Sequence, residues 1–137
     1  MTHDLIVIGA GPAGLSAALT GAELGLRVAL LDEQPLPGGQ IYRNVSAAGP
    51  RLSRLLGPSY TEGRLLTDRL AGSAVTAHGG ALVWDVTQDL TVTALKDGGS
   101  LQLRAPQLIA ATGALERASP VPGWTLPGVM TAGAAQI

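Results

Sequence analysis

The chain has 137 residues, 46% of them hydrophobic, which is enough for one folded domain with a modest core. Its net charge of −1 gives no basic surface for nucleic acid, and its lack of cysteine excludes disulfides, thiolate metal sites and a redox-active cysteine pair in this chain. No apolar run has the length of a membrane span and no secretory signal pattern is present, so we expect a cytoplasmic protein.

The N-terminal stretch, residues 4–32, has the order strand, glycine turn, helix, strand and acid. Residues 5–8 form a continuous apolar run, which is typical of a strand buried on both faces of a parallel sheet. An apolar helical pattern follows and ends at Gly25, a residue type favoured just past a helix C-terminus. A second apolar run, residues 28–31, ends in Asp32. Between the first strand and the helix stands G-x-G-x-x-G, formed by Gly9, Gly11 and Gly14.

This order predicts that the glycine turn binds the pyrophosphate of a dinucleotide. Gly9 permits a tight turn, Gly11 lets the pyrophosphate approach the backbone, and Gly14 lets the helix pack on the sheet. The helix begins at about Pro12, so its free N–H groups and dipole face the phosphates. The alternative is a glycine-rich turn without a ligand, but the second strand and its terminal acid favour nucleotide binding.

Asp32 lies 23 residues beyond Gly9, where an acid accepts hydrogen bonds from the adenosine ribose. A carboxylate there repels a 2′-phosphate, so NADP is disfavoured. This unit is expected to bind the ADP half of a dinucleotide. FAD and NAD share that half, so the motif does not distinguish between them.

The next loop contains paired glycines, Gly38 and Gly39, directly after the ribose-binding acid. We interpret them as a close approach to the cofactor, the alternative being an ordinary surface loop. Gln40 is then placed to bond a ring edge of the cofactor. Tyr42 and Arg43 either reach substrate or phosphate or are solvated.

The remainder alternates short helical and strand-like segments. The pattern over residues 44–57 predicts an irregular connection with one short helix. The pattern over residues 58–70 predicts a helix with Leu65, Leu66 and Leu70 on one face. His3 and His78 have no acid or cysteine cluster around them, so no metal site is predicted. We expect a third parallel strand at 74–77, a small antiparallel meander at 82–86, 90–95 and 100–104, a buried strand at 108–111, and then a loop-like tail.

Three separated motifs, GAGPAG at 9–14, GGQ at 38–40 and AATGA at 110–114, together resemble the FAD-binding domain of the pyridine-nucleotide-disulfide oxidoreductase superfamily. Two longer stretches, DEQPLPGGQIYR and VPGWTLPGVMTAGAAQ, are similar to the flavoprotein subunits of bacterial amine-oxidising dehydrogenases. That group includes opine oxidase, hydroxyproline dehydrogenase and hydrogen cyanide synthase.

The resemblance implies an α/β fold: a Rossmann-like FAD-binding domain, with a parallel sheet and helices, at residues 1–119, and a meander at about 80–105. Residues 120–137 would cross toward a second dinucleotide domain, so we expect a chain incomplete at its C-terminus. Ala134 stands where the family's returning Gly-Asp strand end would need Asp. The implied cofactor-binding residues are Gly9, Ala10, Gly11, Pro12, Ala13, Gly14, Asp32, Glu33, Gly39, Gln40, Ala111, Thr112 and Gly113.

The implied function is hydride transfer to FAD from an amino acid, imino acid or opine-like amine, beside a second oxidoreductase subunit in a hetero-oligomer. NAD is the alternative cofactor. The alternative function is a non-catalytic ADP- or NAD-binding module within a complex. No residue is identified as a proton-transfer group, and we expect this chain alone to be inactive.

Overall fold

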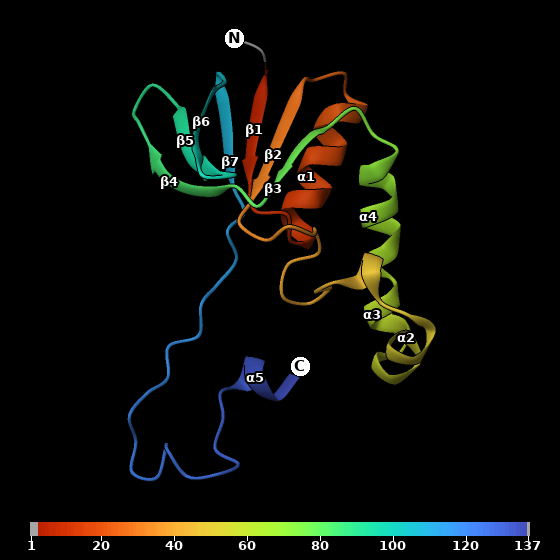
Figure 1. Ribbon diagram of the computed structural model, residues 1–137, viewed down its shortest axis with the longest axis vertical. Coiled ribbons are helices and arrows are strands. Elements are labelled where there is room, and N and C mark those ends of the chain that lie inside the picture. The colour runs from red at the N-terminus through yellow and green to blue at the C-terminus, as the bar shows by residue number, and fades with distance from the viewer. Residues whose placement is uncertain (1–2, 137) are drawn as a thin grey trace.

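The computed structural model describes residues 3–136, which form two sheets and a set of helices (Figure 1). The first sheet is parallel with strand order β3-β2-β1-β7, and the second is antiparallel with order β4-β5-β6. The predicted α/β fold class, a parallel sheet with helices and a meander, is confirmed. The strands are β1 (Leu5–Ile8), β2 (Val28–Asp32), β3 (Thr76–Gly79), β4 (Leu82–Val86), β5 (Thr91–Lys96), β6 (Gly99–Arg104) and β7 (Gln107–Ala110). The helices are α1 (Pro12–Glu23), the 3-10 turn η1 (Val45–Ala47), α2 (Pro50–Leu56), α3 (Pro58–Thr61), α4 (Gly63–Ala71) and α5 (Ala132–Gln136).

Strands β1 and β2 are buried on both faces, as their continuous apolar runs predict. One face packs on α1, with Leu66 and Leu70 of α4 at its side. The opposite face, which includes Ile6 and Leu31, packs on the antiparallel sheet through side chains such as Val92. The parallel sheet therefore lies between a helical layer and the meander (Figure 1).

The order of strands creates a point where successive connections diverge. The chain passes from β1 to β2 and then to β3 on one side, and it returns to pair β7 with the other side of β1. The carboxyl ends of β2, β1 and β7 therefore lie at one edge of the sheet. Open α/β sheets bind ligands in the crevice at such a point.

Helix α4 differs from its prediction at both ends. The expected single helix over 58–70 is two helices, with Glu62 between them, and α4 begins at Gly63, where a Cβ would overlap the ring of Tyr42. Leu65 is 68% exposed, so it does not share the packed face of Leu66 and Leu70. The short-helix region before it contains η1 and α2 rather than one helix.

The third parallel strand begins at Thr76, two residues later than predicted. Ser73 accounts for the delay, because its N–H and hydroxyl both donate to the carbonyl of Leu70, at 3.1 and 2.8 Å. The same hydroxyl accepts the N–H of Val75 at 3.2 Å. These hydrogen bonds form a turn directly after α4, and β3 begins only after that turn. The meander strands and β7 lie within one residue of their predicted bounds.

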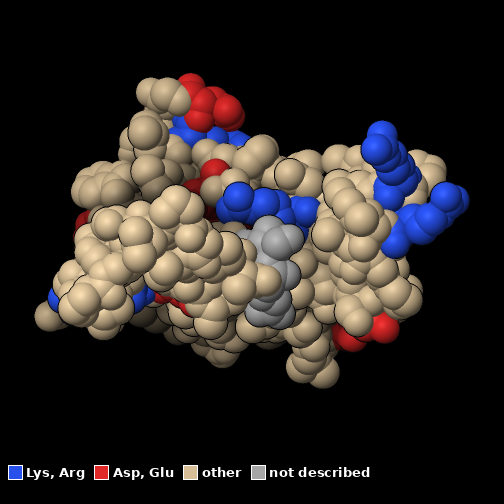
Figure 2. Space-filling model, turned by 90° about the horizontal axis from the view of Figure 1, so that it is seen from below, with Lys and Arg blue, Asp and Glu red and all other residues tan. Residues whose placement is uncertain are grey.

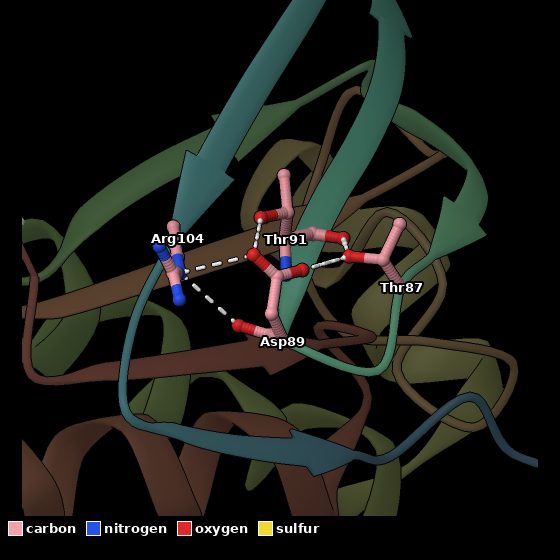
Figure 3. A network of polar contacts seen from close by, with 4 residues as sticks. All are labelled: Thr87, Asp89, Thr91 and Arg104. Atoms are coloured by element: carbon pink, nitrogen blue, oxygen red, sulfur yellow. Dashed lines mark hydrogen bonds and ion pairs between the residues drawn. The ribbon is translucent and has the colours of Figure 1, made fainter.

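The meander is closed at one end by a polar network (Figure 3). The Thr87 hydroxyl donates to Asp89 at 2.5 Å, and the Thr91 hydroxyl donates to the other carboxylate oxygen at 3.2 Å. Arg104 on β6 donates to the Asp89 carbonyl at 3.1 Å and pairs with its carboxylate at 3.4 Å. Hydrogen bonding from Thr87 lowers the pKa of Asp89. The network joins the turn before β5 to the end of β6.

After β7 the chain runs away from both sheets (Figure 1). The tail is loop-like as predicted, except for α5, which the sequence did not suggest. The Glu116 carboxylate accepts hydrogen bonds from Thr131 and from the N–H of Gly133, the latter at 2.7 Å, and these bonds lower the pKa of Glu116. They close a loop over residues 116–133 whose apolar side chains, including Trp124 and Leu126, are exposed.

Charged side chains are sparse on the face seen in Figure 2, and Lys and Arg atoms stand in separate groups there. None of the helices within residues 3–136 has the length and apolar character needed to cross a lipid bilayer.

Candidate functional site

A cavity of about 540 Å³ lies at the carboxyl edge of the parallel sheet. Its walls come from the glycine turn, the end of β2, the loop over 33–44, the start of β4 and the segment after β7. Pockets for small ligands commonly have volumes in this range. Most of the predicted site residues line the cavity: Gly9, Gly11, Pro12, Ala13, Asp32, Glu33, Gly39, Gln40, Ala111, Thr112 and Gly113. Ala10 and Gly14 are buried behind this lining.

The three glycines of the turn have different physical reasons to be glycine. Gly9 has φ +103°, and a Cβ on it would overlap the carbonyl oxygen of Ala111. A Cβ on Gly14 would overlap the carbonyl oxygen of Gly9. Gly11 has an ordinary φ of −73°, and a Cβ there would meet only the Cα of Gly39, at 3.8 Å. The fold therefore requires glycine at 9 and 14, whereas at 11 the space is open toward the cavity.

The first turn of α1 supplies backbone donors beside Gly11. Pro12 has no N–H, and the first helical hydrogen bond runs from Leu15 N–H to the carbonyl of Gly11, at 2.9 Å. The N–H groups of Ala13 and Gly14 therefore have no partner within the helix. No acidic residue stands in this first turn, so the positive end of the helix dipole is not offset by a carboxylate of the helix itself.

Asp32 has a structural role that the sequence did not indicate. Its Oδ2 accepts the N–H of Ala10 at 2.5 Å, and its Oδ1 accepts the N–H of Gln34 at 2.7 Å. The carboxylate thus joins the glycine turn to the end of β2. Each carboxylate oxygen retains a further lone pair that can accept a ligand hydroxyl. Glu33 is exposed beside it and also lines the cavity.

The paired glycines fold their loop over the glycine turn. Gly38 N–H donates to the carbonyl of Ala10 at 2.8 Å, and a Cβ on Gly38, at φ +132°, would overlap the carbonyl oxygen of Tyr42. A Cβ on Gly39, at φ +63°, would lie 2.8 Å from the Cα of Gly11. Both glycines are therefore explained by backbone conformation and packing. The next residue, Gln40, is exposed at the cavity.

Sequence reasoning did not identify one wall of the cavity, which Ala81, Leu82 and Val83 form. Ala81 N–H donates to the carbonyl of Asp32 at 2.8 Å, so the start of β4 is fixed beside the end of β2. A signal was present in the glycine pair 79–80, since a turn just after the third parallel strand must lie at the same sheet edge as Asp32.

Among the residues described, His78 is the titratable group near this sheet edge whose pKa is shifted. Partial burial, together with the charge of Lys96, lowers the pKa of His78. Its Nε2 is buried and has no hydrogen-bond partner, and the side chain does not line the cavity. Within residues 3–136 no group of His, Cys, Asp and Glu side chains has the arrangement of a metal site.

Comparison with known proteins gives one consistent result. The model of the pyridine nucleotide-disulphide oxidoreductase family matches residues 3–135. An opine oxidase subunit of Agrobacterium tumefaciens is 47% identical over 98% of this chain and 28% of its own length. The hydrogen cyanide synthase subunit HcnB of Pseudomonas protegens is 36% identical over 100% of this chain and 30% of its own length. The chain thus spans less than a third of the length of these relatives.

Among solved structures, T. acidophilum thioredoxin reductase has a TM-score of 0.63 and 26% identity to this chain. The match covers 87% of this chain and 38% of that protein.

Proposed function

This chain belongs to the pyridine nucleotide-disulphide oxidoreductase family, and we propose that it forms the FAD-binding part of an oxidoreductase that acts on an amino acid, imino acid or opine-like amine. The observation that carries the proposal is the open side of Gly11. Gly11, the N–H groups of α1 that have no partner within the helix, and the Asp32 carboxylate all lie at the same cavity. This cavity is at the sheet edge where the strand connections diverge.

The residues present fit a dinucleotide. The glycine turn and the first turn of α1 would hold the pyrophosphate, as helix N-termini commonly do. Asp32 would accept the ribose hydroxyls on the β2 side of the cavity, with Glu33 beside it. Gly39 and Gln40 of the loop after β2, and residues 111–113 after β7, would face the flavin half.

When bound, a flavin supplies the redox chemistry by accepting a hydride. The part of this chain is to hold and orient the cofactor, since its 137 residues include no cysteine that a dithiol exchange would need. The name opine oxidase supports an opine-like amine as substrate, and the designation of both relatives as subunits supports a hetero-oligomeric assembly. The exposed apolar loop over 116–133 is a surface suited to such a contact.

A second candidate is a non-catalytic module that binds ADP or NAD within a complex. It is favoured because Gly11 and Asp32, to which we assign ligand contacts, would both contact the ADP half that FAD and NAD share. The two functions differ in what lies on the β7 side of the cavity.

Calorimetric titration of the chain with ADP, NAD and FAD separates these functions. If residues on the β7 side contact the isoalloxazine, FAD binds more tightly than ADP, and NAD does not. A gain for NAD over ADP with none for FAD would replace the first function with the second. A chain that binds none of the three would refute both.

A further inference from the structure

The charged side chains that line the cavity are two acids and one arginine. Asp32 and Glu33 stand at the end of β2, and Arg43 stands in the loop that follows the paired glycines. Among the described residues that line the cavity, Arg43 is the single Lys or Arg. The three formal charges sum to −1, although the proposed ligand carries a doubly charged pyrophosphate.

Arg43 lies in a segment whose backbone is held in place. Its carbonyl accepts the hydroxyl of Tyr60 at 2.7 Å, and Val45, two residues later, is fully buried. Asn44 between them has φ +57°, a left-handed conformation in which few residues other than glycine are stable. The position of the Arg43 backbone therefore does not depend on its guanidinium.

The guanidinium itself is exposed, and no carboxylate within residues 3–136 forms an ion pair with it. Arg27, Arg69 and Arg104 are paired with acids, whereas Arg51, Arg54, Arg64 and Arg117 form no ion pair within residues 3–136. None of these four lines the cavity, so Arg43 is the unpaired arginine that a ligand there would meet. An unpaired guanidinium has five N–H donors in a planar fork that matches the oxygens of a phosphate or carboxylate. Because Arg43 lines the cavity, its guanidinium is placed to bind an anionic group of a ligand there.

We propose that Arg43 is the oxyanion-binding residue of this cavity. The inference rests on the proposed function and extends it to the chemistry of the ligand. The oxyanion has two possible sources, the pyrophosphate of the dinucleotide or the carboxylate of an amino acid substrate. A charge-assisted, two-pronged hydrogen bond from arginine serves either source.

The test compares Arg43→Gln and Arg43→Lys with Arg51→Gln, a matched exposed arginine on α2 that lies outside the cavity. Affinities for ADP, adenosine and FAD are measured by calorimetry. The FAD-loaded chain is then titrated with L-proline and with pyrrolidine, which lacks the carboxylate, and binding is read from the shift of the flavin absorbance band, which requires no turnover. Thermal melts establish that each variant is folded.

A pyrophosphate source predicts that Arg43→Gln weakens ADP binding by roughly 10- to 100-fold and leaves adenosine unchanged, with partial recovery in Arg43→Lys. A carboxylate source predicts unchanged ADP and FAD affinities, and a response to L-proline that is lost while the response to pyrrolidine is kept. If Arg43→Gln matches Arg51→Gln in every titration, the inference is wrong and the proposed function stands. A wild-type chain that binds neither ADP nor FAD overturns both.

Discussion

Replacing Gly11 by valine should abolish nucleotide binding and leave the fold nearly unchanged. A Cβ at Gly11 meets no protein atom closer than the Cα of Gly39, at 3.8 Å, and the backbone φ of −73° suits any residue. The cost to folding is then that of losing glycine at a helix N-cap, a few tenths to about 1 kcal/mol. The side chain would instead occupy the space that the pyrophosphate needs.

The loss of affinity follows from the donors beside Gly11. If the displaced pyrophosphate loses charge-assisted hydrogen bonds to two N–H groups, at about 1.5–3 kcal/mol each, binding weakens by at least ~3 kcal/mol. That free energy corresponds to more than about 100-fold in the dissociation constant. Calorimetry with ADP measures it directly.

Gly49→Val is the matched control. Gly49 is also an N-cap before a proline, with φ −72° and no atom near its missing Cβ, but it begins α2 away from the cavity. The two variants should melt at similar temperatures, and only Gly11→Val should lose ADP. Undiminished ADP affinity in Gly11→Val would show that the pyrophosphate does not lie at this turn. Unfolding of Gly11→Val alone would show a structural role instead.

Three further predictions concern the same sheet edge. Asp32→Ala should weaken ADP binding by about 1.5–3 kcal/mol and also lower the melting temperature, because the N–H groups of Ala10 and Gln34 lose their acceptor; unchanged values in calorimetry and thermal melts would contradict both roles. Gly14→Ala should destabilise the folded state without any ligand, since its Cβ overlaps a backbone carbonyl, and a melting temperature equal to wild type would show that the turn can relax. The lowered pKa of His78 means that the unfolded chain binds this proton more readily than the folded chain. Stability from this group should therefore be complete above about pH 6.5 and fall as the pH drops below it. Melts of His78→Gln across that range should show a smaller fall than wild type, and equal falls would refute the assignment.

The elements around the glycine turn were predictable because their signals are local. The apolar runs at 5–8 and 28–31 and the residue type at Gly25 need no knowledge of distant contacts, and β1, α1 and β2 lie where these signals place them. The delay of β3 was not predictable, because it depends on which carbonyl the Ser73 side chain bonds after α4.

Features of the site that depend on contacts distant in sequence were missed for the same reason. Sequence spacing explains Gly9 by its turn, whereas the structure adds close packing against Ala111 of the segment after β7. The hydrogen bond from Ala10 to Asp32 requires the register of β1 on β2, and no local pattern reports it. The wall at 81–83 likewise depends on how the third strand meets the second.

Ala10 joins three segments through its own peptide groups. Its N–H donates to Asp32, and its carbonyl accepts the N–H of Gly38. The turn after β1 is therefore bonded through Ala10 to both Asp32 and the loop after β2. Neither the turn nor the loop can open without breaking one of these hydrogen bonds. The amide hydrogens of Ala10 and Gly38 should exchange with solvent as one cooperative unit. A ligand that touches only the glycine turn would then slow exchange in the second loop as well, and would protect that loop from proteases at a distance from the phosphates.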